Sequence, residues 1–150
     1  MTDDKTRSVE VERVSVGRYR VRNRRGGSIS IGSGEGDDFT PVELLLAAIG
    51  GCTGIDVDML TSRRAEPDEF SVRVSGDKIR DESGNRMENL TVEFTVSFPD
   101  GEAGDAARQA LPLAVQRSHD RLCTVSRTVE MGSPVAAEIV DQQTSAPSGG

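Results

Sequence analysis

One apolar stretch, residues 40–60, constrains the fold of this chain more than any other feature. It starts like a helix, because Thr40 is a good N-cap, Pro41 suits the first helical position and Glu43 completes a Thr-x-x-Glu capping box. The next turns are apolar on nearly every side, which is typical of a buried helix. We expect the run to be too short for a membrane span, and two aspartates follow closely. The sequence therefore predicts the central helix of a soluble core.

The predicted central helix has two further properties that need an explanation. It is expected to end around residues 62–65, before Pro67, which makes it about 35 Å long. A small sheet does not cover a helix of that length, so we infer that a partner chain helps to bury it. Glycines weaken a helix interior by about 1 kcal/mol each. Three glycines lie close together in this helix, at Gly50, Gly51 and Gly54. They indicate either that another backbone packs closely against the helix or that a substrate must reach Cys52, the one cysteine in the stretch.

Length and charge limit the class of protein. The 150 residues fit one domain, which we expect to span residues 1–143, followed by a disordered Ser-, Pro- and Gly-rich tail at 144–150. The net charge of −7 argues against non-specific binding to nucleic acid or to anionic membranes. The N-terminus has no apolar segment of the kind found in signal peptides. A cytoplasmic, non-membrane protein is the expected class.

The other elements predict an α+β fold. The N-terminal part alternates as an antiparallel meander, and the cleanest alternation later in the chain predicts a β-hairpin. A second helix follows, which Pro112 is expected to kink or split. After Gly132, Val135, Ala137 and Ile139 predict a last strand. The expected strands before it are residues 9–16, 19–23, 28–31, 70–74 and 90–98, and the second helix is expected at residues 103–120.

Alternating arginines mark one of the N-terminal strands. Such a ladder suits a nucleic-acid surface, but the overall acidity and an aromatic content of 3% weigh against it, because single-stranded nucleic acids stack on aromatic rings. A solvated strand face is the simpler interpretation. The arginines are Arg18, Arg20, Arg22 and Arg24.

The two cysteines, Cys52 and Cys123, are 71 positions apart, so only the fold can bring them together. Inert core thiols are the default interpretation. If the two meet, one thiolate can reduce a peroxide and become a sulfenic acid, which the second thiol converts to a disulfide. This chemistry needs a nearby cation and Cα atoms within about 7 Å. Cations surround Cys123 in sequence, whereas Cys52 has none before Arg63, so its activator is expected from the N-terminal arginines.

Two motifs resemble the OsmC/Ohr family, named for osmotically inducible protein C and the organic hydroperoxide resistance protein. They are Pro41–Cys52 (PVELLLAAIGGC) and Leu122–Thr128 (LCTVSRT), and the order of elements up to about Val140 also fits. The resemblance implies an intertwined α+β homodimer with two packed central helices and active sites at the subunit interface. It implies thiol-dependent reduction of hydroperoxides, organic ones above all, with electrons from a dithiol such as a lipoylated protein. We expect no metal or cofactor.

The resemblance also assigns roles to single residues. Cys52 matches the peroxidatic cysteine and Cys123 the resolving one. The family uses an arginine from the N-terminal strands, for which we select Arg18, with Arg13 and Arg24 as rivals.

The catalytic glutamate of the family departs from its usual place in this chain. It directly follows the proline in the family, and here that position is Val42, with Glu43 one position later. Nine helical steps of about 100° place Glu43 on the face opposite Cys52, and the capping box alone explains it. Both roles stay open for Glu43. The triple-leucine form resembles a less characterised branch of the family, so a substrate other than an organic peroxide also stays open.

Two alternatives to a peroxidase remain at this stage. The chain could be a dimeric binding protein that holds a small apolar ligand at its interface, with idle cysteines. It could instead bind zinc, because His119 lies four residues before Cys123 and would share a helix face with it, with Cys52 and Asp56 completing the ligands. A surface histidine explains His119 without a metal.

Overall fold

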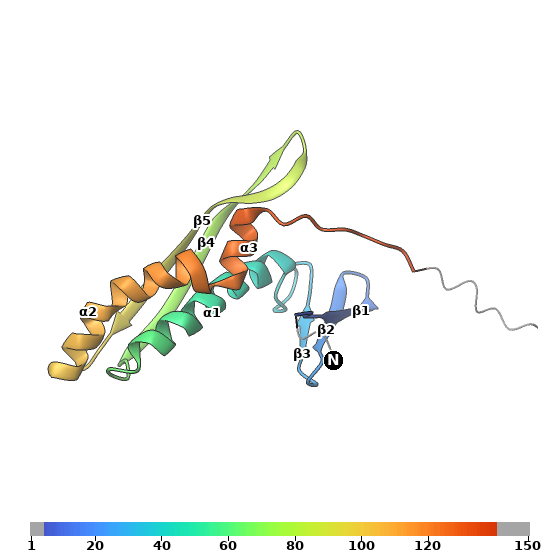
Figure 1. Cartoon of the computed structure of the whole chain (residues 1–150). Coiled ribbons are helices and arrows are strands. Elements are labelled where there is room, and N and C mark those ends of the chain that lie inside the picture. The colour runs from blue at the N-terminus through green and yellow to red at the C-terminus, as the bar shows by residue number, and fades with distance from the viewer. Residues whose placement is uncertain (1–4, 141–150) are drawn as a thin grey trace, which may run out of the picture.

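The structure is a computed structural model, which describes residues 5–140 and confirms the α+β class. A three-stranded antiparallel sheet, β1–β2–β3, leads into the central helix, and a long β4–β5 hairpin and further helices follow (Figure 1). The elements are β1 (Val9–Ser15), β2 (Arg18–Asn23), β3 (Ser28–Ile31), α1 (Pro41–Thr61), β4 (Glu69–Asp81), β5 (Gly84–Ser97), α2 (Glu102–Arg117), the π-helical turn η1 (Ser118–Leu122) and α3 (Thr124–Met131).

The central helix α1 begins where the sequence predicts. The amide of Glu43 donates to Thr40 Oγ1 at 3.2 Å, and the amide of Thr40 donates to Glu43 Oε1 at 3.0 Å, which forms the capping box. The helix ends at Thr61, one residue before the predicted range. Its 21 residues are long and apolar enough to cross a membrane, so the expectation that it is too short was wrong. In the structure α1 packs against β4 and α2, as the core helix of a protein does.

The β4–β5 hairpin covers one side of α1, and it is longer than the alternation predicts. Every second residue is half-buried over residues 70–76 of β4 and 90–96 of β5, and Phe70 and Phe94 meet edge to face with ring centroids 6.4 Å apart. The register shifts between Ser75 and Asp77. Figure 1 shows the far end of the hairpin extending beyond the helices.

The glycines of α1 allow this hairpin to approach closely. A Cβ atom at Gly50 would lie 2.7 Å from Val74 Cγ2, and one at Gly54 would lie 3.4 Å from Val72 Cγ2. Gly51 differs, because a Cβ atom there would meet nothing within 4 Å. Close packing therefore explains Gly50 and Gly54, and Gly51 leaves open space beside Cys52.

The region after β5 differs from its prediction in two ways. Pro112 does not split α2, which runs unbroken to Arg117 and then widens into the π-helical turn η1. A third helix, α3, was not predicted. Cys123 is its N-cap, and Gly132 ends it in the left-handed conformation at a φ of 65°.

The predicted last strand is wrong for the single chain. Residues 133–140 pair with no strand among the described residues, and the side chains of Val135 and Ile139 are 95% and 98% exposed. A strand needs the edge of a sheet to supply its hydrogen bonds. This extended segment runs away from the helices and reaches no sheet edge of its own chain (Figure 1). The tail predicted at 144–150 and the end of the predicted domain at residue 143 lie outside the described residues.

The contact between Gly50 and Val74 gives a first prediction. We expect Gly50→Ala to lower the free energy of unfolding, because the overpacking cost of about 1–3 kcal/mol exceeds the gain in helix propensity of up to about 1 kcal/mol. Val74→Ala should remove the clash, so the double variant should lose less stability than the two single losses together. Urea unfolding of all four proteins measures this coupling. Strict additivity would contradict the packing explanation.

Candidate functional site

The fold brings the two cysteines together. Cys52 lies half-buried on α1, Cys123 is fully buried at the start of α3, and both are free thiols. Their sulfur atoms and a carboxylate oxygen of Asp56 all lie within 4.8 Å of one another. Two sulfurs at this separation can form a disulfide after a small movement, because bonded sulfurs are about 2 Å apart.

A buried hydrogen-bond network fixes this meeting point. The Ser118 hydroxyl donates to Asp56 Oδ2 at 2.9 Å and accepts from Thr53 Oγ1 at 2.8 Å. Ser118 is fully buried and starts the π-helical turn, and its carbonyl accepts from the amide of Cys123 at 2.9 Å. The network thus ties the end of α2 to the turn of α1 that follows Cys52. It also sets the position of Cys123.

The Cys123 sulfur is held by the first turn of α3. The thiol donates to Ser126 Oγ at 3.2 Å, and the amide of Ser126 donates to the sulfur at 3.4 Å. Arg127, a cation four residues after Cys123 in the sequence, donates to the carbonyl of Asp120 at 2.9 Å. The hydrogen-bond partners of the Cys123 sulfur are therefore a hydroxyl group and an amide group.

The surroundings of Cys52 favour its neutral thiol. Burial raises the pKa of Cys52, and the neighbouring Cys123 and the negative charge of Asp56 act in the same direction. A hydrogen bond with the backbone of Val125 acts against them. No cation within the described part of the chain lowers this pKa. A single chain therefore holds Cys52 as a thiol at neutral pH, and a cation from elsewhere is needed to make it a strong nucleophile.

The predicted arginine and glutamate lie apart from this pair in the single chain. Arg18, on β2, bonds Asp38 at 3.3 Å, and its side chain is 65% exposed. Its rivals Arg13 and Arg24 are exposed on the same N-terminal part. Glu43 is bound to Thr40, and these hydrogen bonds lower the pKa of its carboxyl group. Neither Arg18 nor Glu43 contributes to the shift of the Cys52 pKa.

Sequence reasoning named Asp56 only as a zinc ligand and missed Ser118 and Thr53. The spacing of four residues between Cys52 and Asp56 is a signal for Asp56, because it places both on one helix face. Ser118 carries no such signal. Its contact with α1 depends on how the π-helical turn packs.

His119 does not join the cysteines. Its two ring nitrogens contact Asp120 at 3.0 Å and Glu130 at 2.9 Å, which raises the pKa of the imidazole. The predicted four-ligand zinc set is therefore not assembled. The residues that could hold a metal here are Cys52, Asp56 and Cys123.

A cavity of about 520 Å³ adjoins the site. Its wall includes Thr53, which directly follows Cys52 in the sequence, and Ser126, which bonds the Cys123 sulfur, but neither cysteine itself. Most of the remaining wall is apolar and comes from α1, β5, α2 and α3, through Ile49, Val92, Phe94, Pro112, Val115 and Val129. A small apolar molecule fits a cavity of this size and character.

Comparisons with known proteins agree with this architecture. A family model described as OsmC-like protein matches residues 34–138. An uncharacterised protein of Mycobacterium tuberculosis is 35% identical over 133 residues, which cover 87% of this chain and 94% of that protein. A hypothetical protein from Aquifex aeolicus has a TM-score of 0.69 at 22% identity, covering 86% of this chain and 90% of its own. An OsmC-like protein of unknown function from Vibrio cholerae has a TM-score of 0.67 at 14% identity, with 83% and 94% covered.

The carboxylate beside the cysteines gives a second prediction. Asp56→Asn should lower the pKa of Cys52, because it removes a negative charge that opposes the thiolate. The pH dependence of alkylation by iodoacetamide, measured in a Cys123→Ser background, reports this pKa. Asp58→Asn is the matched control, since Asp58 is exposed on the same helix and does not act on Cys52. An unchanged profile for Asp56→Asn would contradict the geometry.

The His119 contacts give a third prediction, on pH. The raised pKa means that the contacts stabilise the fold fully below the unfolded pKa of about 6.5 and are lost as the pH rises through the raised value. The side chain is 62% exposed, so His119→Gln should cost less than about 1 kcal/mol at pH near 5.5 and nothing near pH 9. Urea unfolding at both pH values measures the difference. A larger loss at the alkaline pH would refute the assignment.

Proposed function

Because this chain belongs to the OsmC-like protein family, we propose that it is a thiol-dependent peroxidase that reduces organic hydroperoxides. The observation that supports this most is the approach of two free sulfurs, Cys52 and Cys123, to within 4.8 Å. Two inert core thiols from distant parts of the chain have no reason to face each other across a shared carboxylate. A pair that forms and releases a disulfide needs this arrangement.

The proposed reaction has two steps in the protein. The Cys52 thiolate attacks the terminal oxygen of the hydroperoxide, so that a sulfur–oxygen bond forms, the oxygen–oxygen bond breaks and an alkoxide leaves. The alkoxide takes up one proton, equivalent to the one released when the thiol ionised, and becomes the alcohol. The Cys123 thiol then attacks the sulfenic acid, a disulfide forms and water leaves. An external dithiol, such as a lipoylated protein, supplies two electrons and restores both thiols. No metal or other cofactor takes part.

The cavity next to the cysteines supports an organic substrate. Its wall is mostly apolar, and it includes Thr53, the residue after Cys52, and Ser126, which bonds the Cys123 sulfur. Burial of an alkyl group there would stabilise the complex by about 25 cal/mol for each Å² removed from water. Hydrogen peroxide has no apolar part and would gain nothing from this cavity.

Exposed apolar surface supports a homodimer. The side chains of Val9 and Val11 on β1, and of Ile55 on α1, are 61%, 54% and 63% exposed. The whole chain has 12,030 Å² of accessible surface, whereas a compact monomer of 16.1 kDa has about 7,400 Å². Residues outside the described range would add only about 2,200 Å² even if fully extended. A second copy that covers β1, the free side of α1 and residues 133–140 would remove the remaining excess.

The dimer would also supply the missing cation. The N-terminal sheet packs little against the helices of its own chain (Figure 1), so its exposed arginines can reach a neighbouring subunit, although Arg18 would have to exchange its bond to Asp38 for one to that subunit. We assign Arg18 to stabilise the Cys52 thiolate and the departing alkoxide, with Arg13 and Arg24 as its rivals. A guanidinium near the sulfur would offset the burial that raises the pKa of Cys52.

Glu43 keeps two possible roles within this proposal. Its contacts with Thr40 form the capping box, and a glutamine can form the same box. A catalytic glutamate needs its negative charge, and a cap does not. Activity of a Glu43→Gln variant therefore separates the two roles.

The reaction also suits a particular compartment. A disulfide that must be reduced in every turnover needs a dithiol donor, which reducing compartments maintain. A cytoplasmic role in oxidative-stress defence is therefore part of the proposal.

Turnover of peroxide gives the fourth prediction. Reduced protein with cumene hydroperoxide and dihydrolipoamide should consume peroxide, and Cys52→Ser should abolish this, because no other thiol attacks the oxygen. Without the dithiol, Cys123→Ser should still release one equivalent of alcohol per site and then stop as a sulfenic acid. Dimedone labelling of Cys52 detects that acid. Unchanged turnover by Cys52→Ser would refute the assignment of the nucleophile.

Two rival functions make different predictions. A ligand-binding protein with idle cysteines would bind an apolar molecule in the 520 Å³ cavity and form no disulfide with peroxide. A zinc protein is favoured by one observation, the grouping of Cys52, Asp56 and Cys123. Elemental analysis of the protein as purified tests the zinc hypothesis directly. One zinc per chain, lost in Asp56→Asn, would replace the peroxidase proposal.

A further inference from the structure

A second cavity lies at the other end of the α1–α2 pair, and it is basic. It has a volume of about 660 Å³ and lies between the C-terminal end of α1 and one side of α2. Its wall carries three arginines and no carboxylate: Arg63, Arg64 and Arg117, with Leu60, Ala106, Gln109, Ala110, Leu113 and Ala114. Leu60 is eight residues beyond Cys52, or about 12 Å along the helix, and no residue of the thiol site lines this cavity, although Arg117 directly precedes Ser118.

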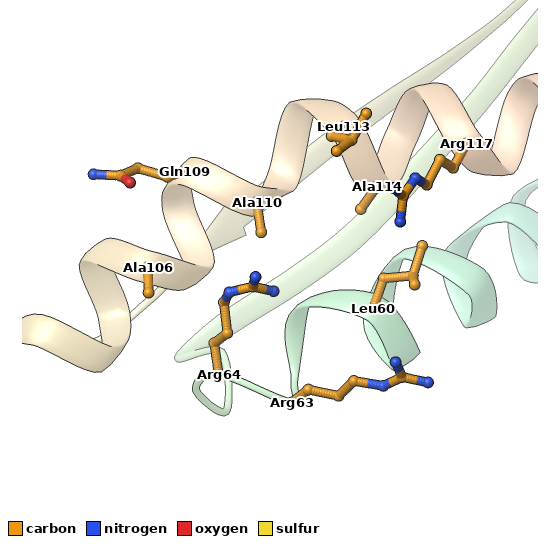
Figure 2. A pocket seen from close by; sticks show the side chains of 9 residues that line it. All are labelled: Leu60, Arg63, Arg64, Ala106, Gln109, Ala110, Leu113, Ala114 and Arg117. Atoms are coloured by element: carbon orange, nitrogen blue, oxygen red, sulfur yellow. The ribbon is translucent and has the colours of Figure 1, made fainter.

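Two of the guanidinium groups converge, one from the turn that follows α1 and one from the last residue of α2. Figure 2 shows Arg64 and Arg117 pointing into the gap between α1 and α2, while Arg63 extends along the outer side of α1. Between them, the small side chains of Ala110 and Ala114 leave the gap open (Figure 2). The cavity therefore has cationic edges and an apolar floor.

None of the three arginines has a partner within residues 5–140. Their guanidinium groups form no hydrogen bond or ion pair there. Arg108, which lies on α2 like Arg117, bonds both Asp105 and the carbonyl of Phe98. Arginines near helix C-termini are often explained by the helix dipole. That explanation accounts for a charge at each helix end, but it does not require two guanidinium groups to enter one cavity. The convergence of two unpaired guanidinium groups on one cavity is therefore the feature that needs an explanation.

We propose that this cavity binds a small amphipathic anion, a phosphate or carboxylate head group on an apolar chain. Arg64 and Arg117 would bind the head group, because guanidinium groups bind such anions through paired N–H donors. Arg63 would add charge at the rim. The apolar chain would lie on Leu60, Ala110, Ala114 and Leu113, whose 51% exposed side chain would be covered. A volume of about 660 Å³ is in the range of small-molecule sites, which favours this ligand over a macromolecule.

The binding of octyl phosphate to the purified full-length protein tests this fifth prediction. Isothermal titration calorimetry should show that octyl phosphate binds at least tenfold more tightly than octanol or inorganic phosphate, because each of these lacks one half of the ligand. The affinity for octanoate, measured in the same way, shows whether the site prefers a carboxylate or a phosphate head group. Binding should weaken with added salt, as expected for partly exposed charges.

Matched variants localise the site. Arg64→Gln together with Arg117→Gln should weaken octyl phosphate binding at least tenfold. Arg73→Gln together with Arg80→Gln removes the same charge from exposed positions on β4 and should not change it. Ala110→Phe should fill the apolar floor and weaken binding, with both arginines intact. Cys52→Ser should bind like the unchanged protein, so this inference stands or fails separately from the peroxidase.

Several results would overturn the proposal. These are no binding of octyl phosphate at millimolar concentration, equal binding of octanol, or equal losses in the two arginine pairs. Size-exclusion chromatography adds one more outcome. If Arg64→Gln with Arg117→Gln changes the oligomeric state, a second copy of the chain occupies the cavity and the ligand proposal is wrong.

Discussion

The hydrogen bonds of Ser118 are the interaction on which the candidate site depends. They join the end of α2 to Thr53 and Asp56 on α1, and Ser118 begins the turn whose last bond positions Cys123. Because Ser118 is fully buried, its hydroxyl group would be costly to leave unpaired, so the contact is specific as well as stable. Two sulfurs that are remote in sequence face each other as a consequence.

Burial at this point has a chemical cost. The same packing that aligns the sulfurs raises the pKa of Cys52 and places the Asp56 carboxylate beside it. A nucleophilic thiolate therefore requires a positive charge that one chain does not provide among its described residues. The exposed valines of β1, the open side of α1 at Gly51 and the unpaired segment 133–140 indicate where a second chain would add both surface and charge. Formation of the dimer would then also activate the Cys52 thiol.

The parts predicted well from sequence are those that local chemistry determines. The capping box of Thr40 and Glu43 set the start of α1, and alternation located the hairpin on which Phe70 and Phe94 meet. The motifs around Cys52 and Cys123 identified the family. The parts predicted poorly depend on distant contacts. The π-helical turn and α3 follow from how Ser118 packs, and Pro112 was tolerated within α2. The strand expected at 135–139 has the right alternation but no sheet edge to join in its own chain.

The account rests on the claim that oxidation joins Cys52 to Cys123, and peptide mapping of the non-reduced protein tests it most directly. Reduced protein is treated with one equivalent of cumene hydroperoxide, alkylated at acidic pH and digested without reductant. The account predicts a single cross-linked peptide pair that contains Cys52 and Cys123, formed within one chain and absent after dithiol treatment. If Cys52 and Cys123 are instead found in two separate alkylated peptides after peroxide treatment, the account is contradicted.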